Sequence, residues 1–280
     1  MLALGDVDGF RQNLETQLEA VERTRYYSET YLVSASRAAI ATAEGDLAAA
    51  ERDIVEYAGD QRGNVTSAVT SAAQLYTLRQ MQGKLGELEP AWRLAVARWP
   101  GLPIMHAGLA LVLASGGKEA EAATELDELT GDNLENIPRD FVWKPTLYLA
   151  ADACAEMEYQ PPATVLYDAL LSYASTHSAI TNIVAQGSVA RVLGRLAALL
   201  ERWNGSERHF ETALAENKRV GFHAWTTWTR LNYGDMLLRR DGSGDREKAR
   251  ALLEQALEEA RAMGMAKVVE DCERLLGGSE

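Results

Sequence analysis

The sequence predicts an all-α fold, a solenoid of about six helical hairpins with extra helices at its ends, and three observations support this. Alanine and leucine, which favour helices, dominate an apolar content of 47%. The 7 prolines cluster at expected helix starts, such as Pro90, Pro103 and Pro145. A short pattern of small and large apolar residues also recurs along the chain, which is typical of stacked helical hairpins.

The recurring pattern is a small residue, a large apolar residue four positions later and another apolar residue three positions after that. These offsets place all three residues on one helical face, where the small residue lets a partner helix approach closely. Two clear copies are Ser206, Phe210 and Ala213, and then Ala249, Leu253 and Ala256. Copies start at Ala50, Ala122, Ala163, Ser206 and Ala249, and weaker copies with a large first residue start at Phe10 and Leu88, so that the intervals are 34 to 43 residues.

A first helix can be placed upstream of each of these second helices. In "VARVLGRLAALLERW", the pair Leu193 and Gly194 stands at the expected close approach before Ser206. In the last unit the small residue is Gly234, because "DGSGD" lengthens the turn and offers Asp245 as a helix cap. Each unit therefore predicts one helical hairpin.

The two ends differ from this plan. Residues 7–25 form a helix of the second type with no first helix before it, and "AKVVEDCERLLGG" forms a single closing helix. We therefore expect residues 1–280 to be one repeat domain that is a fragment of a longer chain. The alternative is a natural protein whose first helix caps the stack. An uncovered first helix would also allow a homodimer.

Charge and cysteine content narrow the class of protein. A formal net charge of -13 argues against direct nucleic-acid binding, which needs clustered Lys and Arg. Residues 1–20 carry charges where a signal peptide would be apolar, and no apolar run approaches the ~20 residues that span a bilayer. Cys154 and Cys272 are expected to be buried free thiols. We expect a cytoplasmic protein that contacts neither a membrane nor nucleic acid.

No catalytic or cofactor-binding motif is recognisable. The sequence has no GxxxxGK[ST] phosphate loop and no Gly-rich loop after an expected strand. Ser188 in "QGSVA" lacks the second glycine of a nucleophile elbow, and no strand is expected before it. None of the usual metal-binding spacings is formed by the histidines, which are His106, His177, His209 and His223. We therefore expect no enzymatic activity, no cofactor and no metal site.

The segment 163–264, with "GSVARVLGRLAALLERW" and "GSGDREKARALLEQALEEARAMG", resembles the C-terminal tetratricopeptide-like region of large bacterial signalling ATPases. In those proteins the repeats follow an AAA-type or STAND-type ATPase, often with a nucleotide-cyclase or LuxR-type DNA-binding domain. Residues 1–160 fit the same region more weakly. The resemblance implies a right-handed α–α superhelix, with any ATPase or cyclase parts outside residues 1–280. The chain departs from the family at Glu201, where Gly is usual, and at Asn204 to Ser206, where an acidic turn is common.

In such repeats the first helix of each hairpin lines the concave surface, and the resemblance implies which positions face inward. In the N-terminal half they are mainly small, which predicts a smooth apolar surface: Ala35, Ala39, Thr42, Ala73, Thr77, Ala107 and Ala114. In the C-terminal half they are charged or aromatic, and these are the candidate ligand- or partner-binding residues: Tyr148, Asp152, Glu156, Arg191, Arg195, Trp228, Asp235 and Arg239.

Arg191 and Arg195 share a helical face and could clamp a carboxylate or phosphate, while Trp228 could stack on a sugar, a base or an aromatic side chain. The alternative is that both arginines pair with Asp152, Glu156 or Asp235 across neighbouring helices. We interpret the other tryptophans of this region as packing residues: Trp143, Trp203 and Trp225.

Together these features predict a non-catalytic module that senses a small effector or binds a protein or peptide, within a bacterial signalling or transcription-regulating ATPase. The alternative is a free-standing adaptor that scaffolds protein partners through a peptide-binding groove. Saturable small-molecule binding would favour the sensor, and binding of extended peptides would favour the adaptor.

Overall fold

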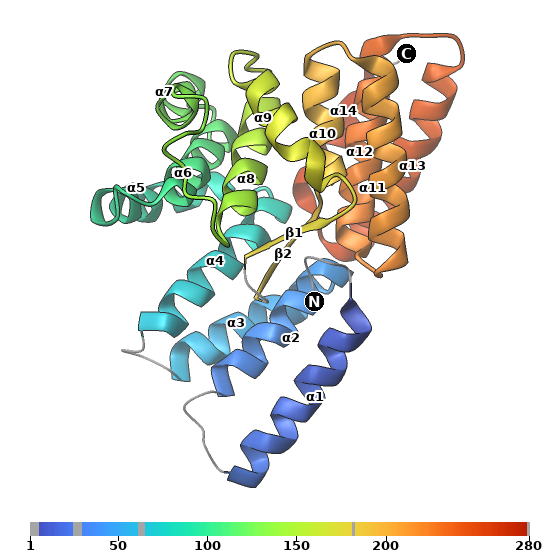
Figure 1. The fold of residues 1–280 in the computed structure, drawn as a ribbon. Coiled ribbons are helices and arrows are strands. Elements are labelled where there is room, and N and C mark those ends of the chain that lie inside the picture. Colours follow the sequence, from blue (N-terminus) through green and yellow to red (C-terminus); the bar gives the residue numbers. More distant parts are fainter. Residues whose placement is uncertain (1–5, 25–29, 61–64, 181–182, 279–280) are drawn as a thin grey trace.

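The computed structural model describes residues 6–24, 30–60, 65–180 and 183–278, and helices dominate this part of the chain (Figure 1). The predicted all-α class is therefore confirmed. Within these residues, no helix is long and apolar enough to cross a membrane.

The described elements run in the order that the repeat pattern predicts, with one β-hairpin inserted before the tenth α-helix. The helices of the N-terminal half are α1 (Val7–Thr24), α2 (Thr30–Glu44), α3 (Leu47–Asp60), α4 (Val65–Met81), η3 (Leu85–Leu88), α5 (Glu89–Arg98), α6 (Pro103–Ser115) and α7 (Glu119–Thr130). The remaining elements are α8 (Trp143–Glu156), α9 (Ala163–Leu170), η4 (Leu171–Tyr173), β1 (His177–Ile180), β2 (Val184–Ser188), α10 (Val189–Leu199), α11 (Trp203–Arg219), α12 (His223–Arg240), α13 (Asp245–Met263) and α14 (Ala266–Gly277).

Consecutive helices pack as hairpins, and the recurring small residues lie at their close approaches. In the α10–α11 pair, a Cβ atom at Gly194 would lie 2.8 Å from the Phe210 ring, so only glycine fits without movement. Ser206 Oγ donates a 2.7 Å hydrogen bond to the Gly194 carbonyl across the same contact. In α12–α13, Gly234 faces Leu253 in the equivalent way. The small-large pattern therefore marks real helix contacts.

The predicted end helices are present as α1 and α14. The first packs on α2, and Leu14 of its repeat pattern is buried. The side chains of the other two pattern residues, Phe10 and Gln17, lie outside the described part. The closing helix α14 packs on α13 and α12, and it also contacts α4. Both cysteines are buried free thiols, as predicted.

The β1–β2 hairpin is a feature that the sequence did not predict. Its strands pair antiparallel, with His177 opposite Ser188 and an irregularity between Ser178 and Ala179. A strand therefore does precede Ser188, which corrects the sequence-based expectation. Ser188 does not act as an exposed nucleophile, because it is fully buried and its Oγ accepts a hydrogen bond from Ala190 N as the cap of α10.

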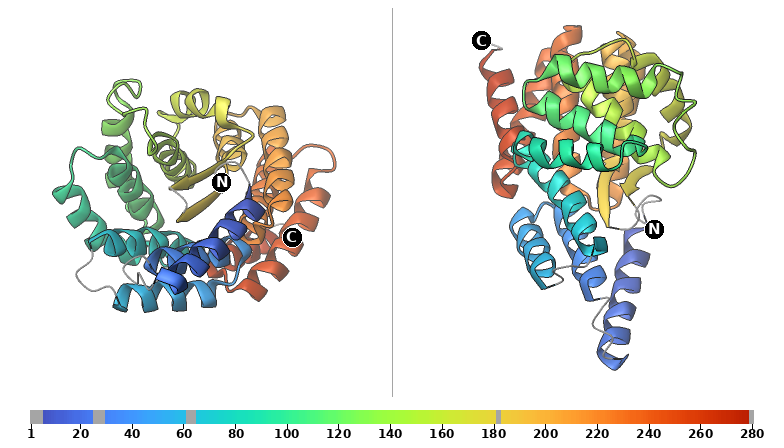
Figure 2. Two further views of the ribbon diagram at one scale, coloured as in Figure 1. Left: turned by 60° about the horizontal axis from the view of Figure 1, so that its bottom comes forward. Right: turned by 90° about the vertical axis from the view of Figure 1, so that its left-hand side faces the viewer.

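The hairpin lies in the middle of the molecule, and the helices surround it (Figure 2, left). Strand β2 contacts α2, α4, α10, α11 and α12, while β1 contacts α8. Two side chains hydrogen-bond to its backbone: Gln74 Nε2 donates to the Ile183 carbonyl at 2.6 Å, and Trp225 Nε1 donates to the Ala185 carbonyl at 3.1 Å.

Segments far apart in sequence meet beside this hairpin. Helix α2 packs against α12, and α4 packs against α14. One hydrophobic core therefore contains residues from both ends of the chain, such as Ala35, Ile54, Trp225 and Val268. A second core fills the middle units, from Tyr76 to Leu199. The small residues that were expected to line a smooth groove are mostly buried here, including Ala35, Ala39, Thr42, Thr77 and Ala107.

Candidate functional site

The candidate site is built around Arg191, which projects from α10. Its guanidinium is fully buried and donates to Asp152 Oδ2 at 2.7 Å and to Tyr148 Oη at 2.9 Å, both on α8. It also donates to Asn232 Oδ1 on α12 at 3.0 Å. The Arg191 side chain thus joins α8, α10 and α12, each of which is the first helix of its hairpin.

Aromatic rings surround the same guanidinium. The Arg191 Cζ atom lies 5.4 Å from the Tyr148 ring centre, 5.5 Å from that of Trp225 and 5.9 Å from that of Trp228. The two tryptophan rings stack on each other, with centroids 5.9 Å apart. These ring faces favour a cation and lower the cost of burying it. The buried arginine is therefore satisfied by its own neighbours.

Asp152 is the central anion of this cluster. It accepts from both Arg191 and Arg195, and Gln80 Nε2 of α4 donates to its Oδ2 at 3.1 Å. Burial opposes ionisation of Asp152, but the charges of both arginines outweigh burial and lower its pKa to about 2. Arg195 also pairs with Glu156 at 2.9 Å. The alternative interpretation, in which the arginines pair across neighbouring helices, is confirmed for Asp152 and Glu156.

A pocket of about 400 Å³ opens beside this cluster, between α8, α10, α12 and α14. Five candidate residues line it: Glu156, Arg195, Trp228, Asp235 and Arg239. The other three, Tyr148, Asp152 and Arg191, are buried behind it and hold Arg195 and Trp228 in place. Five of the eight candidate residues therefore line the pocket, and the other three support the pocket-lining side chains from behind.

Asp235 lies on the α12 wall of the pocket. It forms no hydrogen bond with any residue of the described part of the chain. Burial raises the pKa of its carboxyl group, and the positive charges of Arg239, Arg195 and Arg274 oppose this rise without cancelling it. Arg239, one turn along the same helix, has a single contact with Glu158 at 3.4 Å. Both groups have hydrogen-bonding capacity left for a ligand.

The third wall comes from α14, whose residues were not among the candidates. Lys267 Nζ lies 3.1 Å from Asp271 Oδ2 and 3.7 Å from Glu156 Oε1, and Arg274 pairs with Asp271 at 3.4 Å. The sequence signal was present, because Lys267, Asp271 and Arg274 recur at helical spacing and share one face. It was missed because α14 was interpreted only as a closing helix.

The other tryptophans behave as packing residues. Trp143 and Trp225 are buried in the two main cores. Trp203 is half-buried and packs against the small core that contains Phe210 and Tyr233. None of the three lines the pocket.

Within the described ranges, one group of histidine and acidic side chains is close enough to share a metal ion. It consists of His106, Glu125 and Glu128, and none of them lines the pocket. No family model matches the chain, nor does any curated protein or solved structure.

Proposed function

We propose that this chain is a non-catalytic, ligand-sensing repeat module whose pocket between α8, α10, α12 and α14 binds a small zwitterionic effector. The observation that carries the proposal is the arrangement of charge in the pocket. A carboxylate without a hydrogen-bond partner in the described chain, Asp235, lies near the cationic side chains Arg239, Lys267 and Arg274. An ammonium group would pair with Asp235, and a carboxylate would pair with Arg239.

The size of the pocket supports a small ligand. A volume of about 400 Å³ lies at the lower end of the range for small-molecule sites, which is roughly 300–1,000 Å³. Trp228 adds an aromatic surface, and Leu231 and Leu275 add apolar ones. An amino acid or a dipeptide fits this combination of charge and size.

An extended peptide along the inner surface is less well supported. The β1–β2 hairpin covers that surface, and Gln74 and Trp225 hydrogen-bond to its backbone. Such a peptide would have to displace the hairpin and leave these buried donors without partners. The pocket, in contrast, can take a small ligand without moving the hairpin.

The lining residues favour binding over catalysis. The described lining contains no Ser, Thr, Tyr, Cys or His, so its possible bases and nucleophiles are carboxylates and Lys267. Its carboxylates and cations mostly pair with one another, as in Arg195 with Glu156 and Lys267 with Asp271. These pairs support a role in recognising charge.

The repeat pattern and the resemblance to bacterial signalling ATPases support a proposal for the wider role of this module. We take the stack as a tetratricopeptide-like right-handed α–α superhelix that acts in the cytoplasm as a sensor arm. A ligand that binds one arrangement of the stack better than another would bias an attached catalytic or DNA-binding domain. The alternative is a free-standing adaptor for protein partners. The observation in its favour is the exposure of large apolar side chains such as Leu94 and Phe141, each 71% exposed.

Isothermal titration calorimetry with free L-amino acids and dipeptides tests the proposal. We expect saturable binding of one ligand per chain, with much weaker binding of amines and dicarboxylates that carry one sign of charge. Asp235→Asn and Arg239→Gln should each weaken binding by about tenfold or more, which corresponds to the loss of one charged contact.

Arg250→Gln is the matched control, because Arg250 lies on the exposed face of α13 and pairs, within the described part of the chain, only with Glu254. It should bind as the unmodified chain does. Binding of extended peptides that survives both pocket substitutions would favour the adaptor instead. Zwitterions that do not bind, or that bind both pocket variants unchanged, would overturn the proposed site.

A further inference from the structure

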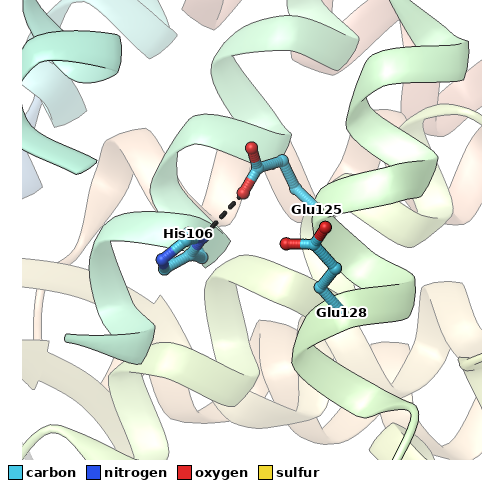
Figure 3. A group of neighbouring side chains, drawn as sticks. All are labelled: His106, Glu125 and Glu128. Atoms are coloured by element: carbon cyan, nitrogen blue, oxygen red, sulfur yellow. Dashed lines mark hydrogen bonds and ion pairs between the residues drawn. The ribbon is translucent and has the colours of Figure 1, made fainter. Parts of the chain in front are cut away.

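Three metal-ligating side chains converge between α6 and α7, outside the pocket. His106 comes from the first turn of α6, and Glu125 and Glu128 come from α7 (Figure 3). Their ligand atoms all lie within 4.8 Å of one another. The sequence could not indicate this group, because 19 residues separate His106 from Glu125 and the helix turn decides whether they meet.

The orientation of the His106 ring is fixed on both sides. Its Nε2 lies 3.1 Å from the Pro100 carbonyl, which can only accept, so this nitrogen carries a proton. Its Nδ1 faces Glu125 Oε2 at 2.7 Å. Histidine ligands of metal ions usually donate their other ring N–H to a carbonyl or carboxylate in this way. The Pro100 contact therefore directs Nδ1 at the two glutamates.

Glu128 completes the group from the next turn of α7. It lies three residues after Glu125, so both carboxylates share one face of the helix and point toward His106 (Figure 3). Among the described residues, Glu128 has no hydrogen-bond or ion-pair partner. Glu125 and His106 are each only 20% exposed, which keeps their side chains in place. The Glu128 side chain can therefore adjust its position, whereas His106 and Glu125 are already held in place.

We propose that His106 Nδ1, Glu125 and Glu128 bind one Zn²⁺ ion, with water as the fourth ligand. Zinc accepts imidazole and carboxylate ligands at about 2.0–2.2 Å in a tetrahedral arrangement, so its ligand atoms lie roughly 3.4 Å apart. Atoms within 4.8 Å reach this arrangement through small rotations of the glutamate side chains. The ion binds the lone pair of Nδ1, so this nitrogen must be without a proton in the zinc-bound state. Calcium and magnesium prefer sites with oxygen ligands alone.

The ion would add a clamp between α6 and α7, which already pack against each other. It joins the first turn of α6 to the last two turns of α7, where α7 has an exposed outer face. Because the ion would bind the folded pair and not the unfolded chain, it stabilises the fold in proportion to its concentration over its dissociation constant. This inference is independent of the proposed function, since no ligand of the ion lines the pocket.

Zinc titration of the chelator-treated 280-residue chain tests this proposal, with a fluorescent zinc indicator as competitor. We expect one Zn²⁺ per chain and a higher melting temperature with zinc than without it. Glu128→Gln removes a ligand without breaking a described hydrogen bond, so this variant folds and should lose affinity by at least about tenfold. His106→Gln should lose zinc binding as well.

Glu119→Gln is the control, because it makes the same charge change at an exposed position of the same helix. It should bind zinc as the unmodified chain does. Nitrogen-15 NMR of the imidazole should show a zinc-dependent shift at Nδ1 of His106. Absence of one-to-one binding, equal binding by Glu128→Gln, or tighter binding of Ca²⁺ or Mg²⁺ than of Zn²⁺ would overturn the proposal.

Discussion

Arg191 Nη2 donates a 2.7 Å hydrogen bond to Asp152 Oδ2, and neither side chain is exposed by more than 1%. The bond joins α10 to α8 directly behind the pocket. A buried ion pair costs desolvation on both sides, so its geometry must be good for the fold to tolerate it. Here Arg195, Tyr148 and Gln80 supply the additional hydrogen bonds.

Replacement of Asp152 should therefore be among the most damaging single changes in the protein. Asp152→Asn keeps the side-chain shape but leaves the buried guanidinium of Arg191 without its main counter-charge. We expect a loss of about 3–5 kcal/mol in the free energy of unfolding, measured by urea denaturation at pH 7. Glu158→Gln is the control, because Glu158 is 65% exposed, and it should change stability by less than about 0.5 kcal/mol. A loss below about 1 kcal/mol for Asp152→Asn would contradict this account.

The close approach of α10 and α11 gives a second prediction. Gly194→Ala places a methyl group 2.8 Å from the Phe210 ring and should destabilise the protein by roughly 1–3 kcal/mol. In a Phe210→Leu background the cost of the same change should be smaller, because the obstructing ring is gone. Gly59→Ala on α3 meets no atom of the described residues within 4 Å and should instead stabilise by up to about 1 kcal/mol. Thermal unfolding of the four variants measures these differences, and equal effects at Gly194 and Gly59 would refute the packing argument.

His177 makes stability depend on pH. Its ring is buried in β1, edge-on to Phe222 at 5.3 Å between centroids. Burial lowers its pKa from 6.5 to about 4, against the negative charge of Glu216 and together with the positive charges of Arg219 and Lys144. The neutral ring is therefore favoured in the folded state. Its contribution is complete above pH 6.5 and is lost as pH falls toward 4, amounting to about 3 kcal/mol.

Urea denaturation at several pH values between 4 and 7 measures this contribution. His177→Gln should flatten the dependence of unfolding free energy on pH in that window. His223→Gln makes the same change at an exposed position at the start of α12 and should leave the slope as it was. An unchanged slope in His177→Gln would show that other groups cause the acid sensitivity.

The two thiols should be unreactive in the folded protein. Burial raises the pKa of Cys154 and that of Cys272 to about 12, and Cys154 Sγ also donates to the Tyr159 carbonyl. Since only the thiolate reacts, Ellman's reagent should label neither in native buffer and both in denaturant. Rapid labelling of the unmodified native chain would show that one of these helices opens locally, and Cys272→Ser would identify which.

The repeat pattern predicted helix contacts well because these contacts are local. Small residues such as Gly194 and Gly234 are needed wherever two helices meet closely, so their positions in the sequence indicate where helices pack. The pairing of Arg191 with Asp152 could be named only as an alternative. Pairing and ligand binding require the same residue types on the same face, so the pattern cannot separate them.

The β1–β2 hairpin could not be predicted from the sequence, because the extra residues of a long repeat unit can form different structures. The units that start at Ala163 and Ser206 are equally long, at 43 residues. The first uses its extra residues for β1 and β2, whereas the second uses them for longer helices and the turn at Gly242. The packing of α2 on α12 depends on rotations accumulated over many units, which no single unit encodes.

The contact of α4 with the β1–β2 hairpin has a consequence for synthesis. Tyr57 donates to Gln74 at 2.7 Å, and Gln74 in turn donates to the Ile183 carbonyl, 109 residues further along the chain. The N-terminal helices leave the ribosome long before the segments that cover them. Until those segments arrive, this early part of the chain exposes apolar surface and unsatisfied donors, unlike a linear array in which each finished unit is stable on its neighbour. Nascent chains halted before residue 183 are therefore expected to recruit chaperones, and the completed chain to release them.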